Sequence, residues 1–162
     1  MWDKNRLLVA LVLLSVVAAV MAYVRINSRR AIVGPAGEPL ELTIREPRDN
    51  AEVGVTEVST GTISPPKGAV IVLVRPIKTG GFWIQEHPIV DGRGIWKTRC
   101  NFGEESVGAG EAYEIVAFAY DDLDIVRKNP ELAAGKRLLA LEELPVAAGR
   151  AVVRVTRRAG PN

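Results

Sequence analysis

The chain has 162 residues, with 21 Lys or Arg, 19 Asp or Glu, one cysteine and one histidine. Its formal charge of +2 arises in the first 30 residues, because residues 31–162 hold 16 basic and 18 acidic side chains and carry about −2. Residues 31–162 are therefore nearly neutral and lack the basic surface of nucleic-acid-binding proteins. With one Cys and one His, the chain has too few ligands for a structural zinc site and cannot form an internal disulfide.

The first predicted element is an apolar run, residues 7–24 (LLVALVLLSVVAAVMAYV), which contains no charged residue. As a helix it would be roughly 27 Å long, close to the ~30 Å of a bilayer's hydrocarbon layer. We therefore predict that residues 1–30 form a single-pass transmembrane anchor. Basic residues flank the run on both sides, where they would meet lipid headgroups: Lys4, Arg6, Arg25, Arg29 and Arg30.

Two alternatives remain for this run. Val20 and Ala22 fit the cleavage site of a secretory signal, although the run is long for that role. A buried core helix is disfavoured because the run has no polar face. The basic flanks do not fix the orientation, since both sides are positive. The short leading tail resembles the n-region of a Sec-type signal and favours an N-terminus on the cytoplasmic side. We therefore expect the chain in a bacterial cytoplasmic (inner) membrane, with residues after the anchor in the periplasm.

Small residues within the run fall at spacings of three and four, which places them on one face of a helix: Ser15, Ala18, Ala19 and Ala22. Such a face allows another membrane helix to approach closely. Alanine is also common in membrane helices for reasons of composition alone. The pattern therefore predicts other membrane protein subunits as partners, beside the lipid bilayer itself.

The Pro- and Gly-rich residues 31–39 (AIVGPAGEP) predict a linker, residues 40–158 one domain, and residues 159–162 a short tail. Alternating or continuous apolar runs of strand length recur along the domain. They predict seven strands, at residues 40–45, 53–63, 70–75, 82–86, 95–100, 113–120 and 151–156. In the fifth strand, Trp96, Thr98 and Cys100 share one face, which we expect to be buried.

Residues 122–144 show helix-capping residues and leucines in place of the strand pattern, and they predict a helical insertion before the last strand. Asn129 followed by Pro130 is typical of a helix N-cap with proline at the first helical position. Leucines at 132, 138, 139 and 141 suggest helical packing, and we expect Gly135 to interrupt it. Because the segment is longer than an ordinary connection between strands, we expect a specialised contact surface.

Short strands separated by turns predict a mainly β fold, an antiparallel sandwich of about seven strands. Over residues 40–157 the sequence resembles bacterial immunoglobulin-like or fibronectin-like modules. The resemblance is carried by LTIREPRDNAEV, VSTGTISPPKGAVIVLVRP, the tryptophans of FWIQ and GIWKT, GEAYEIVAFA and VVRV. These are framework features, so the resemblance implies a fold and no activity.

The residues do not predict catalysis. His87 stands beside Pro88 without the sequence context of a nucleophile that it could activate. Asp121, Asp122 and Asp124 offer oxygen ligands for calcium, but they lack the spacing of an EF-hand loop, and helix capping is the commoner use of such residues. We therefore expect no enzyme activity, no catalytic residue, no cofactor or metal, no nucleic acid and no small-molecule substrate.

A partner or ligand surface is predicted at Trp83, Gln85, Leu138 and Leu139. Trp83 is either core or an exposed platform, since an indole offers a large apolar face with a polar tip. The sequence favours a non-enzymatic accessory or structural subunit that docks through its helix and β-sandwich onto a larger membrane complex, such as respiratory, photosynthetic or envelope machinery. The alternative is a membrane-anchored surface module that binds glycan or another ligand through exposed aromatic side chains.

Overall fold

The computed structural model describes residues 40–105 and 107–159. The predicted anchor, its flanking basic residues, its small-residue face and the linker at 31–39 all lie outside the described residues. Within the described part of the chain, no helix is long and apolar enough to cross a membrane.

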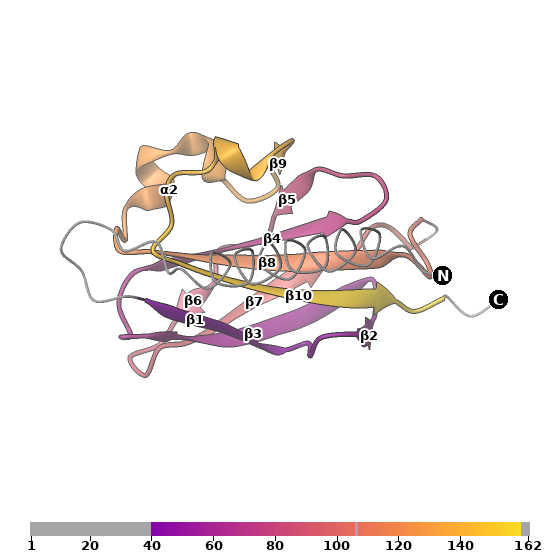
Figure 1. The fold of residues 1–162 in the computed structure, drawn as a ribbon, viewed down its shortest axis with the longest axis horizontal. Helices are drawn as coiled ribbons and strands as arrows, with labels where there is room; N and C mark the ends of the chain where they lie inside the picture. Colours follow the sequence, from indigo (N-terminus) through magenta and orange to yellow (C-terminus); the bar gives the residue numbers. More distant parts are fainter. Residues whose placement is uncertain (1–39, 106, 160–162) are drawn as a thin grey trace, which may run out of the picture. The chain divides into compact units, whose positions relative to one another are not determined.

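Ten strands in the described residues form two sheets, which confirms the expectation of a mainly β, two-sheet fold (Figure 1). Sheet A has the order β1 (Glu41–Glu46), β3 (Thr56–Ser64), β7 (Ile95–Asn101) and β6 (Ile89–Val90). Sheet B has the order β2 (Ala51–Val53), β10 (Gly149–Arg157), β8 (Ala112–Tyr120), β4 (Ala69–Pro76), β5 (Phe82–Ile84) and β9 (Arg137–Leu138). Neighbouring strands are antiparallel except β2 and β10, which are parallel.

The main core lies between the two sheets. Residues of β7 alternate between buried and exposed, as the period of two requires, and Trp96 and Cys100 are fully buried. This confirms the predicted inward face of that strand. The Trp96 indole lies directly over Gly61 of β3, where any Cβ would overlap the ring and the Thr43 carbonyl oxygen. Glycine at 61 is therefore required by the close approach of its neighbours.

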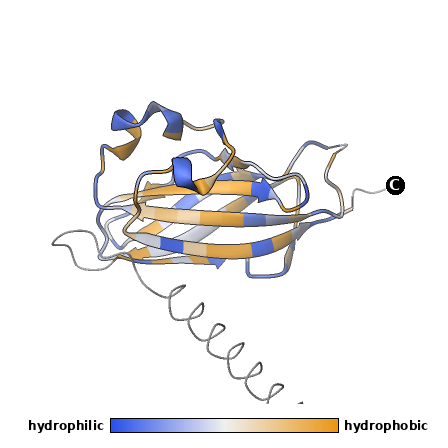
Figure 2. Ribbon diagram, turned by 45° about the horizontal axis from the view of Figure 1, so that its top comes forward, coloured by the Kyte–Doolittle hydropathy of each residue, from blue (hydrophilic) through white to orange (hydrophobic). Residues whose placement is uncertain are grey.

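The segment between β8 and β10 packs on the outer face of sheet B and forms a second core. It contains α2 (Ile125–Lys128), two 3-10 turns, η1 (Pro130–Leu132) and η2 (Leu141–Glu143), and strand β9. Ile125, Leu132 and Leu138 from this segment pack against side chains of β4, β5 and β8. Figure 1 shows the segment as a separate layer above sheet B, and Figure 2 shows apolar and polar bands alternating along the strands beneath it.

The helical content of this segment is confirmed, but as short turns and not as one packed helix. Asn129 does stand at the N-cap position before Pro130, as predicted. The predicted strand at 53–63 also differs, since Gly54 and Val55 separate β2 from β3. Strands β6 and β9 have two residues each, which is too short to produce a recognisable period in the sequence.

Candidate functional site

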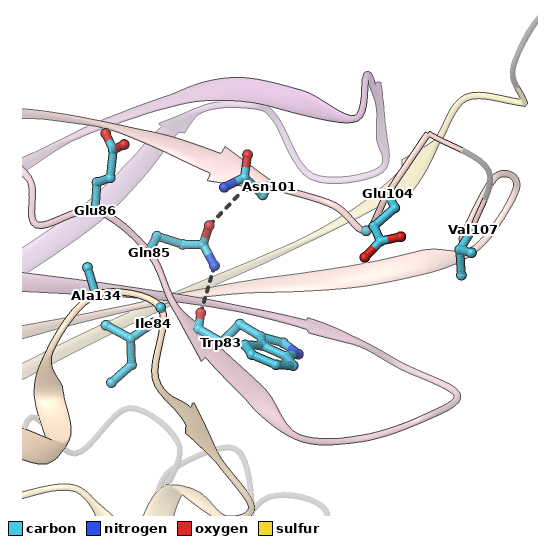
Figure 3. A pocket seen from close by; sticks show the side chains of 10 residues that line it. Trp83, Ile84, Gln85, Glu86, Asn101, Glu104, Val107 and Ala134 are labelled. Carbon is cyan, nitrogen blue, oxygen red and sulfur yellow. Dashed lines mark hydrogen bonds between the residues drawn. The ribbon is translucent and has the colours of Figure 1, made fainter.

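A groove of about 720 Å³ opens at one edge of the sandwich (Figure 3). Three segments far apart in the sequence line it. They are β5 with the residues after it (Trp83, Ile84, Gln85, Glu86), the end of β7 with the following loop (Asn101, Gly103, Glu104, Val107), and the insertion (Ala134, Gly135). Its volume lies within the range of small-molecule sites in proteins.

Strand register explains why Trp83 faces this groove. Phe82 pairs with Leu138 and Ile84 with Leu73, and all four side chains belong to the second core. Since successive side chains of a strand point to opposite faces, Trp83 points the other way, toward the side of sheet A. Sheet A ends there in the two-residue strand β6, and Trp83 is 45% exposed.

Gln85 connects the two sheets at the base of the groove. Its Nε2 donates a hydrogen bond to the carbonyl oxygen of Trp83 at 2.7 Å, and its Oε1 accepts one from the backbone N–H of Asn101 at 2.9 Å (Figure 3). Nearby, the Thr98 hydroxyl donates to the carbonyl oxygen of Glu86 at 2.5 Å. These bonds hold the segment after β5 against β7. Gln85 is only 5% exposed, and its two hydrogen bonds fix the orientation of its amide.

The loop that forms one wall is held by the buried side chain of Arg157. Its guanidinium group donates to the carbonyl oxygens of Phe102, Glu105 and Val107. The Val107 N–H also donates to the Glu104 carbonyl oxygen at 3.1 Å. A wall fixed in this way keeps the Glu104 carboxylate at the rim of the groove.

Both ionisable residues that line the groove, Glu86 and Glu104, are acidic and exposed. Among the described residues, neither carboxylate has a cationic side chain within ion-pair distance. One cation beside the groove is Arg137 of β9, whose guanidinium carbon lies 5.8 Å from the centre of the Trp83 ring. The lining therefore combines an indole, an amide and two carboxylates.

A second charged group on sheet B is internally balanced. The buried Glu114 of β8 accepts hydrogen bonds from Arg75 of β4 at 2.8 Å and from Arg154 of β10 at 3.1 Å. This arrangement ties three neighbouring strands together. Because both carboxylate oxygens of Glu114 already accept hydrogen bonds, we assign these three side chains a role in stabilising sheet B and not in binding a ligand.

Two of the four predicted surface residues lie in the groove. Trp83 and Gln85 both line the groove. Leu138, which pairs with Phe82, packs inward into the second core, whereas Leu139, just after the end of β9, is 74% exposed. Leu138 therefore offers no surface to a partner. His87 lies in the connection between β5 and β6.

Sequence reasoning missed Asn101, Glu104 and Val107 as lining residues. The sequence feature that could have indicated this wall is the polar, glycine-containing loop at 104–111, which lies between the predicted strand at 95–100 and the apolar strand at 113–120. In the described residues, no three His, Cys, Asp or Glu side chains cluster as metal ligands would. Asp122 instead accepts from the Asp124 N–H at 2.9 Å and pairs with Lys128 at 2.6 Å. The hydrogen bond from Lys128 is the main cause that lowers the pKa of Asp122.

No protein-family model matches this chain, and no curated protein matches its sequence.

Proposed function

We propose that this protein is a non-enzymatic, membrane-anchored accessory subunit whose β domain docks on a larger membrane complex. The observation that carries the proposal is the surface of the insertion. Leu123, Leu139 and Val146 are 75%, 74% and 78% exposed, although the same segment buries other leucines. We propose that these side chains belong to one apolar patch, since contiguous exposed apolar patches mark protein contacts.

We further propose that the domain is immunoglobulin-like. The order β1-β3-β7-β6 parallels the A-B-E-D sheet of such domains, and β10-β8-β4 parallels their G-F-C sheet, with β5 at the C′ position. The insertion then occupies the connection between F and G and covers the outer face of its own sheet. Immunoglobulin-like domains commonly act as binding scaffolds, which agrees with a docking role, although fold alone does not determine function.

Gentle detergent extraction followed by size-exclusion chromatography tests the docking proposal. The full chain is expected to elute with partner subunits, and Leu139→Glu is expected to release it, because a charge would be buried at the contact. Val58→Glu provides a matched control, since Val58 is an exposed apolar residue of sheet A. Recovery of the unmodified chain only as an isolated monomer would contradict the proposal.

A second candidate function is glycan binding, and the groove at Trp83 is the observation that favours it. Sugar rings stack on exposed aromatic faces, and carboxylates and amides accept hydrogen bonds from hydroxyl groups. Titration of the full chain with oligosaccharides should quench tryptophan fluorescence, and Trp83→Phe should remove the response. An unaltered signal with every sugar would reject this candidate.

A further inference from the structure

We propose that the groove at Trp83 selects a glycan carrying free ammonium groups, such as a chain of deacetylated amino sugars. This inference rests on glycan binding as the second candidate function and names the chemical class of the ligand. The groove joins an apolar stacking surface to fixed hydrogen-bonding groups and to two carboxylates, and each of these parts selects a different feature of the ligand.

The indole selects a ring. Trp83 is 45% exposed on β5, and its position is set by strand pairing with Val74 of β4 on one side and Arg137 of β9 on the other. An exposed aromatic face on a rigid strand favours a flat apolar surface such as a pyranose face. The Arg137 guanidinium already stacks against this indole. A second cation there would be repelled, so the sugar ring, and not its ammonium group, would lie against Trp83.

The amide of Gln85 selects hydrogen-bonding groups. Gln85 is more than nine-tenths buried, yet it lines the groove. Each of its two amide atoms makes one hydrogen bond to the protein. The Nε2 group has a second N–H, and Oε1 has a second lone pair. A ligand hydroxyl can accept a hydrogen bond from this N–H and donate one to this lone pair. Because the Gln85 side chain is already ordered, ligand binding costs little side-chain entropy.

The carboxylates select positive charge. Glu86 and Glu104 lie on opposite sides of Gln85 in the groove (Figure 3), and among the described residues no cationic side chain lies within ion-pair distance of either carboxylate. A neutral sugar leaves this negative potential uncompensated, whereas ammonium groups on neighbouring sugars would satisfy it. Their separation along the groove favours a chain over a single sugar.

Isothermal titration calorimetry on the full chain in phosphatidylcholine nanodiscs tests this inference, with empty nanodiscs as the blank. The probes are chitosan tetraose with protonated amines, its fully N-acetylated counterpart, and spermidine as an amine without sugar rings. We expect chitosan tetraose to bind about tenfold more tightly than either of the others. The variants Glu86→Gln and Glu104→Gln should each weaken it about two- to fivefold, and added salt should weaken it further.

Glu142→Gln is the matched control, because Glu142 is an exposed glutamate of the insertion outside the groove. It should bind as the unmodified chain does. Equal, Trp83-dependent binding of the acetylated and deacetylated oligosaccharides would overturn the selection for ammonium groups while leaving glycan binding intact. Spermidine binding as tightly as chitosan tetraose would overturn the role of the sugar. Binding of neither oligosaccharide would overturn both proposals.

Discussion

Arg157 is buried at the end of β10, and its guanidinium group donates to three backbone carbonyl oxygens in the loop after β7. A buried charge is costly unless its hydrogen-bonding groups are satisfied. Here carbonyl dipoles supply the acceptors. The same bonds fix the loop that carries Glu104 and Val107, so one side chain links the stability of the sandwich to the shape of the groove.

Arg157→Lys is therefore expected to lower the free energy of unfolding by about 2–3 kcal/mol, because an ammonium group cannot reach all three acceptors that the guanidinium fork reaches. Urea denaturation measures the change. Arg158→Lys, at an exposed neighbouring position, is the control and should change stability by less than about 0.5 kcal/mol. Equal effects of the two substitutions would show that the buried fork does not stabilise the loop.

Cys100 is fully buried between the sheets, and burial raises the pKa of its thiol from 9.0 to about 11. The unfolded chain therefore loses the thiol proton at a lower pH than the folded chain does. Since deprotonation then favours the unfolded state, the thiol's contribution is complete below pH 9.0 and is lost as the pH rises to about 11.

We expect the free energy of unfolding to fall across this interval, with about 2–3 kcal/mol arising from Cys100. Cys100→Ala should reduce the slope between these pH values, whatever its effect on absolute stability. The remaining slope would include Tyr120, whose pKa burial raises to about 12. Denaturant unfolding at a series of alkaline pH values measures both slopes. Identical slopes for the unmodified chain and Cys100→Ala would show that the thiol does not cause the loss of stability.

At the scale of elements, the insertion has two distinct surfaces. Leu132 in η1 is buried against the outer face of sheet B, whereas Leu139, next to β9, faces solvent. Leu132→Ala should lower the free energy of unfolding by about 2–4 kcal/mol through the cavity that it leaves. Leu139→Ala should change it by less than about 0.5 kcal/mol. Thermal unfolding of the two variants compares them directly, and comparable losses would mean that the insertion does not form a second core.

The elements of the two sheets were largely predictable because their periods are visible in the sequence. Trp96, Thr98 and Cys100 alternate with charged residues, and the continuous apolar runs of β4 and β8 have the length of strands. In the structure, the insertion packs against the outer face of β4 and β8, so both faces of these strands are buried. Its form was less predictable, because the spacing of its leucines suggests helical packing, whereas in the structure Leu132 and Leu138 contact strands that lie far away in the sequence.

The groove was predictable only at Trp83 and Gln85. Asn101 and Glu104 reach it from another sheet and another loop, and no local pattern reports that contact. The same limit explains Leu138 and Leu139. They look alike in sequence, and only the pairing of β9 with β5 determines that Leu138 packs inward. Long-range strand pairing, and not local propensity, thus decides which residues form the site.

At the scale of the whole molecule, the chain divides into residues 1–30 and 31–162. The second unit has its own cores on both faces of sheet B and a nearly balanced charge, so its stability should not depend on lipid. A chain that begins at residue 31 is therefore expected to fold and to match the full chain in its free energy of unfolding, within about 0.5 kcal/mol. Circular dichroism with urea denaturation measures this.

The same truncation tests the anchor. The full chain should remain in the membrane pellet after a carbonate wash, because about 18 apolar residues make spontaneous release from the bilayer very unfavourable. The chain from residue 31 should appear in the supernatant. Intact-mass measurement of the full-length product then separates retention from cleavage, since removal at Ala22 would leave a shorter, released protein. Release of an uncleaved full chain would contradict the anchor, because the apolar run would then have to be buried in protein instead of lipid.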